Sequence, residues 1–222
     1  MKNLIIIIVA ILALAGVGWY VFTLENSTDS VSEEESSVIA VINGEDVTRS
    51  DLNALQAQVA AEQGFDVSTL SEAEQAQFTE QMIDTLISQI LLRQATEKAG
   101  IVVTEADIEA QWQMIRGQFP DEEAFNEALA ASGVTAEELR LRIGNDLAVE
   151  TYLEQELSLS EIEASEAEID EAYEQFAGQQ ELPPLDEMRD EMAGFVVQQK
   201  QQELVATFVS QLRDEATVEI LI

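Results

Sequence analysis

The chain has 222 residues, with 44 acidic residues against ten basic ones, no histidine and no cysteine, and its formal net charge is −34. The lack of histidine excludes a Ser-His-Asp triad and any histidine-ligated metal site. The lack of cysteine excludes disulfides, thiolate zinc sites and a lipidated cysteine. Because phosphate groups would repel so acidic a surface, nucleic acid is not an expected partner. No cofactor or metal site is predicted.

Residues 4–22 form an uncharged run of nineteen residues rich in Ile, Leu, Val and Ala. As a helix the run would span roughly 28 Å, close to the thickness of a bilayer core. Trp19, Tyr20 and Phe22 stand at its far end, where aromatic rings favour the membrane interface. The run therefore predicts a transmembrane signal-anchor. The alternative is a signal peptide cleaved after Ala15, which would leave an apolar stub on the mature chain.

The flanking charges predict the orientation of this anchor. Lys2 precedes the run, and no further basic residue appears before Arg49. The positive-inside bias places residues 1–3 in the cytoplasm and the rest of this single-pass protein outside the cell membrane. Residues 23–37 are polar and acidic, which predicts a flexible tether. Their alternative role is a docking site for a basic partner.

Residues 38–222 read as a mainly α-helical domain with a small sheet. The apolar run 38–42, the pair Asn43-Gly44 and residues 45–47 predict a β-hairpin. Helix-start signals recur along the chain; they are Thr48 to Asp51, Ser71 to Glu74, Thr104 to Asp107, Thr135 to Glu138 and Ser165 to Glu168. A long helix is predicted over 185–216 and an apolar strand over 217–222. We expect that strand to pair with residues 38–42.

The order of these motifs resembles a known family. The runs VIAVINGEDVTRSDL (38–52), QMIDTLISQILLRQATEKAGIVVTEADIEA (81–110) and GVTAEELRLRI (133–143) are similar to the N-terminal chaperone domain of the SurA family. Residues 182–222 resemble the segment that follows the parvulin isomerase domain in SurA, PpiD and PrsA-type foldases. The resemblance implies a helical chaperone domain, 38–222, whose C-terminal helix and strand pack back onto its N-terminal part. The single span before an exported domain is similar to PpiD.

One departure from the family pattern is informative. The foldases carry a parvulin domain between these two parts, whereas here Phe176 and Pro183 are separated only by residues 177–182. Parvulin sites also use histidines, which this chain lacks. The resemblance therefore implies the chaperone part without the isomerase, and no catalytic residue is predicted.

The first functional hypothesis is a membrane-anchored extracytoplasmic chaperone. Its partners would be unfolded or nascent exported polypeptides, bound through exposed apolar surface on a soluble scaffold. The candidate client-binding residues are Trp112, Met114, Phe119 and Phe125. Each has a competing interpretation as a core residue. Phe119 is the strongest candidate, because it precedes Pro120 at an irregular break rather than within a periodic stripe.

Two other classes of function remain open at this stage. The domain could be a non-catalytic adaptor that binds one dedicated envelope or translocase partner. It could also be a peptidyl-prolyl isomerase, which the missing parvulin domain argues against. Apolar clefts of this family type can also hold homodimers together. Neighbouring carboxylates such as Asp121 to Glu123 lack the alternating ligands and central glycine of an EF-hand loop, so solvated surface is the better interpretation.

Overall fold

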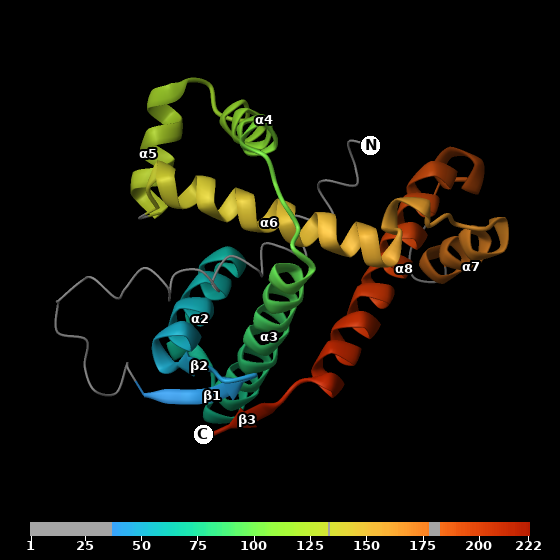
Figure 1. Ribbon diagram of the computed structural model, residues 1–222. Coiled ribbons are helices and arrows are strands. Elements are labelled where there is room, and N and C mark those ends of the chain that lie inside the picture. The colour runs from blue at the N-terminus through green and yellow to red at the C-terminus, as the bar shows by residue number, and fades with distance from the viewer. Residues whose placement is uncertain (1–36, 133, 178–182) are drawn as a thin grey trace.

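The structure is a computed structural model that describes residues 37–132, 134–177 and 183–222 (Figure 1). The predicted anchor, residues 4–22, lies outside the described residues, as does the predicted tether except for Ser37. Among the residues that are described, no helix combines the length and the apolar character needed to cross a bilayer.

A small antiparallel sheet joins the two ends of the described chain. Its strands are β1 (Val38–Ile42), β2 (Glu45–Thr48) and β3 (Val218–Ile220), in the order β2-β1-β3. Asn43 and Gly44 have φ values of 52° and 89°, as a tight hairpin turn requires. Ala40 lies opposite Ile220, and Ile42 lies opposite Val218. The predicted pairing of the first and last strands is confirmed, although β3 is shorter than the predicted strand 217–222.

Helices fill the chain between these strands. Those in the described part are α2 (Arg49–Gln63), α3 (Glu72–Ala99), α4 (Glu105–Arg116), α5 (Glu122–Ser132), α6 (Ala136–Leu157), α7 (Glu166–Ala177) and α8 (Leu185–Glu215), with short 3-10 turns at Val67–Thr69 and Leu159–Glu161. The mainly α class is confirmed, and α8 ends one residue before the predicted limit. Residues 178–184 separate α7 from α8 in the sequence, so no parvulin domain stands between these helices.

Reciprocal capping fixes where most helices begin. In α2, the Thr48 side chain accepts a hydrogen bond from the Asp51 N–H, and the Asp51 carboxylate accepts one from the Thr48 N–H. The predicted capping boxes of α3, α4 and α6 form in the same way. Each satisfies backbone donors that a helix start leaves free, which stabilises the helix by about 1 kcal/mol.

The larger core lies between the sheet, α2 and α3. Its most buried side chains are Ile39, Ile42, Leu52, Leu55, Leu86 and Ile87. Each such side chain contributes roughly 1.5–3 kcal/mol by leaving water. Leu212 of α8 and Val218 of β3 pack against the same core, so the C-terminal elements complete it.

A second core connects the rest of the molecule. Val149 and Leu153 of α6 meet Val205 of α8 and Leu159, with Leu92 of α3 against them. Figure 1 shows that α6 crosses the end of α3. It also shows that α8 begins beside α7 and runs back to β3. The first half of α6 extends beyond this core and supports α4 and α5. We call residues 101–145, with the exception of 133, the lobe.

Candidate functional site

The lobe is built around a cluster of three aromatic rings. Phe125 of α5 is its centre and is only 3% exposed. The Trp112 ring of α4 meets it edge-on, with 5.1 Å between centroids, and the Phe119 ring lies 5.3 Å away at a tilt. Trp112 and Phe119 are both half-buried. The structure therefore brings three of the four predicted client-binding residues together.

Local backbone geometry explains how Phe119 reaches this cluster. After α4, the Gln118 N–H donates to the Ile115 carbonyl and the Phe119 N–H to the Arg116 carbonyl. The Asp121 carboxylate then accepts from the Ala124 N–H at 2.9 Å and caps the start of α5. These tight turns fold the connection back on itself. The irregular break seen in the sequence thus directs Phe119 towards Phe125.

Met114, the fourth predicted residue, lies apart from the aromatic cluster. It follows Trp112 by two residues, which is about 200° around a helix. Its side chain is 48% exposed, on the side of α4 that is turned away from the cluster. Met114 is therefore more accessible to a partner than any of the three aromatic residues.

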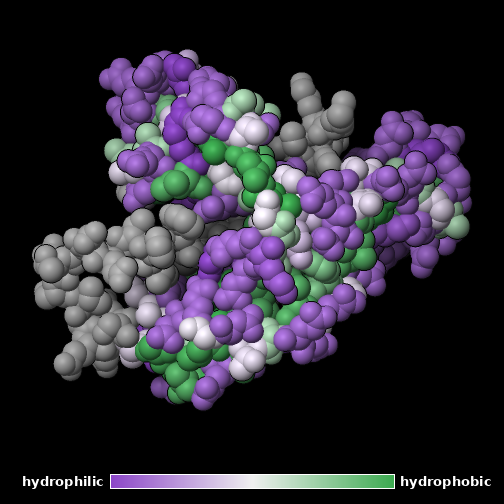
Figure 2. Space-filling model, in the orientation of Figure 1, coloured by the Kyte–Doolittle hydropathy of each residue, from purple (hydrophilic) through white to green (hydrophobic). Residues whose placement is uncertain are grey.

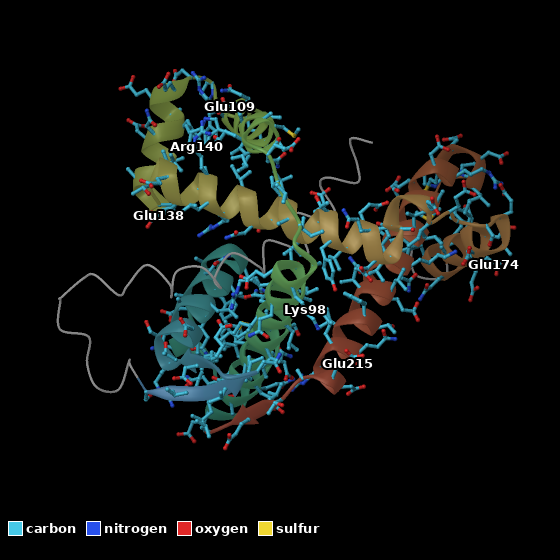
Figure 3. All side chains as sticks on the ribbon, in the orientation of Figure 1. Lys98, Glu109, Glu138, Arg140, Glu174 and Glu215 are labelled. Atoms are coloured by element: carbon cyan, nitrogen blue, oxygen red, sulfur yellow. The ribbon has the colours of Figure 1, made fainter. Side chains whose placement is uncertain are left out.

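Arg140 of α6 holds α4 in place, and sequence analysis did not single it out. Its Cζ lies 4.6 Å from the centroid of the Trp112 ring, within range of a cation–π interaction. Its guanidinium also pairs with Glu109 at 2.5 Å and Glu105 at 3.3 Å, as Figure 3 shows for the labelled Arg140 and Glu109. A hydrogen bond from Gln113 and the contact with Arg140 lower the pKa of Glu109.

The helices α4 and α6 approach each other closely at Gly144. A Cβ atom at that position would lie 3.3 Å from Cδ1 of Ile108. Glycine therefore allows Ile108 to pack directly against the α6 backbone. Together with the Arg140 contacts, this packing makes α4 and α6 one supported unit.

Two exposed apolar side chains lie within or next to this supported unit. Val102, in the connection between α3 and α4, is 83% exposed, and Leu141 of α6 is 41% exposed. Figure 2 shows apolar surface (green) where α3 passes into α4, bordered by hydrophilic surface (purple). Val102 and Leu141 were missed by sequence analysis. Valine and leucine are usually buried, so only the fold reveals that these two side chains are exposed to solvent.

The charged groups of the lobe are mostly acidic. Burial raises the pKa of Asp146, just beyond the lobe on α6, to about 7, with Glu150 adding to the effect and Arg142 opposing it. In the described parts of the chain, no group of three or more carboxylates is placed to hold a metal ion. The arrangement offers apolar contact surface among carboxylates, which suits the binding of an apolar, cationic polypeptide.

Comparison with known proteins identifies the family. The profile of the SurA-like N-terminal domain matches residues 1–153. A solved structure from the human pathogen Campylobacter jejuni superposes with a TM-score of 0.55, covering 83% of this chain and 99% of that one at 13% identity. It comes from work on the virulence factor PEB4 and the periplasmic protein Cj1289, described there as structurally related SurA-like chaperones. A search of curated proteins finds no match.

The family profile covers well over half of the chain, and the solved structure shares its fold. The sheet that joins the two ends of the described chain and the helical lobe agree with the resemblance noted in the sequence. The chain belongs to the family of SurA-like N-terminal domains.

Proposed function

We propose that this protein is an extracytoplasmic chaperone whose lobe binds unfolded or extended segments of exported proteins. The observation that carries the proposal is the exposure of Val102, Met114 and Leu141 on a rigidly supported, acid-rich lobe. Most large apolar side chains of the described chain are buried or partly buried, whereas these three are exposed. An apolar client segment that covers them gains about 25 cal/mol for each Å² of apolar surface removed from water.

The aromatic cluster contributes in two ways under this proposal. Trp112 and Phe119 present their exposed parts to the client. Phe125 lies beneath them, so a client reaches its ring only when one of the two covering rings moves aside. The cluster thus gives the lobe a stiff apolar core, and Val102, Met114 and Leu141 provide the more exposed contacts, Met114 on the side of α4 turned away from the cluster.

The high negative charge supports the same role. A net charge of −34 keeps a chaperone and its bound client soluble, because complexes of like charge repel one another. It also draws positively charged segments towards the surface, most strongly at low salt. Clients that combine apolar and basic residues are therefore the favoured class.

The membrane anchor and the absence of isomerase activity belong to the proposal as well. The uncharged run 4–22 is long enough to span a bilayer, and Lys2 favours a cytoplasmic N-terminus. The short connection between α7 and α8 supports a chaperone that works without a parvulin domain of its own.

An aggregation assay tests the proposal. The full chain, purified in a non-ionic detergent, is added in stoichiometric amounts to a denatured exported protein across a salt series. We expect suppression that persists at high salt, because apolar contact is little screened. The combined variant Val102→Ser, Met114→Ser, Leu141→Ser should lose most of it. The matched control, Gln118→Ser with Asn126→Ser, changes exposed polar residues of the same lobe and should retain it.

Two results would contradict the proposal. Lack of suppression at every salt concentration would favour the adaptor alternative, in which crosslinking in membranes yields one saturable partner. Equal suppression by the combined variant and the control would place client binding outside the lobe. A proline-isomerisation assay on a short peptide would reveal any catalytic activity.

A further inference from the structure

The strand β3 forms one edge of the sheet. The order β2-β1-β3 gives β3 a single neighbour, and no other strand in residues 37–132, 134–177 or 183–222 pairs with it. The Leu221 N–H donates to the Ile39 carbonyl at 2.8 Å, and the Thr217 carbonyl accepts from the Asn43 N–H. Backbone groups alternate in direction along an antiparallel strand. Those of Val218 and Ile220 therefore point away from β1, towards the free edge.

The side chains at this edge are unusually apolar. Ile220, Leu221 and Ile222 are 47%, 51% and 55% exposed, the largest run of consecutive exposed apolar residues in the described chain. Figure 2 shows apolar surface at the foot of the molecule, where Figure 1 places β1 and β3. Proteins normally protect a free edge with lysine, proline or a covering element. The strand β3 contains neither lysine nor proline.

Two acidic residues lie on the outer face of the sheet, one on each side of Val41. Asp46 lies opposite Val41, and Val41 lies opposite Glu219. Both carboxylates are exposed, and neither pairs with a basic side chain in the described part of the chain. A strand added beside β3 would place one residue directly opposite Glu219. A basic residue there would be stabilised, and an acidic one would be repelled.

We infer that the free edge of β3 is a second binding site for client segments, which add to the sheet as an antiparallel strand. The occupant is an extended, apolar segment with a basic residue opposite Glu219. This inference rests on the proposed function, since it names a site and a class of client for the same chaperone. It differs from the lobe in its means of recognition: backbone hydrogen bonds give affinity, and the side-chain pattern gives selectivity.

A second copy of the chain fits this edge less well. Each copy carries a formal net charge of −34, so two approaching copies repel each other. A basic client gains attraction from the same charge. The charge of the protein therefore favours a cationic strand over self-association.

The test uses the full chain in non-ionic detergent and the fluorescent peptide Ser-Val-Ile-Val-Lys-Val-Ser, whose lysine falls opposite Glu219 in antiparallel pairing. We expect Ile220→Pro to weaken binding roughly tenfold, because it removes an outward N–H and leaves the bonds to β1 intact. Ile220→Thr is the matched control, since it also shortens the apolar side chain but keeps the N–H. Its loss should be much smaller.

A second variant keeps the test valid if Ile220→Pro disturbs folding. Glu219→Lys leaves the backbone edge unchanged and reverses its charge. Binding should fall several-fold for the lysine peptide and rise several-fold for its Lys→Glu counterpart. Equal binding by Ile220→Pro and Ile220→Thr, or no response to the charge reversal, would overturn the inference.

The aggregation assay separates this inference from the proposed function. If the peptide fails to bind while aggregation is still suppressed, the edge site is wrong and the lobe retains its role. If neither occurs, both are wrong. Sedimentation analysis checks the remaining occupant: a wild-type dimer that Ile220→Pro converts to monomer would show that the edge holds a second copy instead of a client.

Discussion

The Oδ1 atom of Asn43 accepts a hydrogen bond from the Thr217 N–H at 2.9 Å, although 174 positions separate the two residues. The Asn43 N–H donates in return to the Thr217 carbonyl at 2.8 Å. The Nδ2 atom of Asn43 also donates to Oε1 of Gln94 on α3 at 2.8 Å. One turn residue thus fastens the last strand to the first hairpin and to the central helix.

Asn43→Ala should destabilise the domain by about 2–3 kcal/mol. The change removes two side-chain hydrogen bonds, each worth about 1 kcal/mol. It also places alanine at a φ of 52°, which asparagine tolerates better, so the backbone adds up to about 1 kcal/mol to the loss. Urea unfolding followed by circular dichroism measures the loss.

Asn43→Gly is the matched control for this prediction. Glycine adopts the positive φ freely but makes neither side-chain bond. It should therefore lose less stability than alanine, and the difference reports the conformational cost. An alanine variant as stable as the wild type would show that this turn does not stabilise the two chain ends.

Arg140→Ala should destabilise the lobe by about 1 kcal/mol. The Arg140 side chain is 35% exposed, so its ion pairs with Glu105 and Glu109 are partly screened. Its position over the Trp112 ring adds a cation–π contribution of similar size. The chain has two tryptophans. In a Trp19→Phe background, we expect the Trp112 fluorescence to shift to longer wavelength as the ring meets water.

Arg140→Lys distinguishes the two contributions. Lysine keeps the positive charge but lacks the flat guanidinium that stacks on the indole ring. An intermediate loss of stability is expected. Unchanged fluorescence in both variants would mean that Arg140 does not shield the ring.

The free energy of unfolding should fall as the pH rises from about 4 to about 7, because of Asp146. Burial raises the pKa of this carboxyl from its ordinary value of 3.8 to about 7. Between these values the folded chain holds a proton that the unfolded chain has lost. The stabilisation is therefore complete below the unfolded pKa and is lost as the pH rises through the folded one. Glu150, whose pKa is raised by burial and then by Glu154, acts in the same direction.

Asp146→Asn should increase stability at pH 8, on the order of 1–4 kcal/mol, because the partly buried amide never ionises. Its unfolding free energy should also change less between pH 5 and pH 8 than that of the wild type. Glu156→Gln, at an exposed position of the same helix, controls for the loss of one negative charge. Equal effects of the two substitutions would exclude a specific role for the burial of Asp146.

The sequence predicts the elements of this fold well where the signals are local. Asn43-Gly44 specifies a hairpin through the backbone freedom of its two residues. Thr48 with Asp51 and Ser71 with Glu74 specify helix starts through side chains three residues apart. The pairing of β3 with β1 is a long-range feature. It was still predictable, because few apolar β-type segments exist in this chain for either strand to join.

The candidate site was less predictable, because it depends on which helix faces meet. Trp112, Phe119 and Phe125 could be named from their residue type. That they share one cluster follows from the turn between α4 and α5, which no periodic pattern encodes. Val102 and Leu141 are of residue types that usually lie in a core. Their exposure to solvent becomes visible only in the arrangement of α3, α4 and α6. Arg140 is one basic residue among ten until the fold places it on Trp112.

Gln201 of α8 is a buried polar residue that no sequence signal distinguishes. It is 3% exposed, and its Nε2 donates to the Leu159 carbonyl at 2.8 Å across the second core. Its Oε1 has no hydrogen-bond partner in the described structure. The amide therefore joins α8 to the turn after α6 by a single hydrogen bond. The residue that replaces Gln201 determines which polar groups stay buried without a hydrogen-bond partner.

Gln201→Glu should cost about 3 kcal/mol at pH 8, because an ionised carboxylate replaces the donor and faces the Leu159 carbonyl in an apolar surrounding. Acid should restore part of the loss, since a protonated carboxyl can donate to that carbonyl. Gln201→Met removes the orphaned oxygen but leaves the carbonyl without a donor, so its effect should stay within about 1–2 kcal/mol. Unfolding curves of the three proteins at pH 5 and pH 8 provide the comparison. If the glutamate variant matches the methionine variant at both pH values, water reaches this position and the bond to Leu159 does not hold α8 in place.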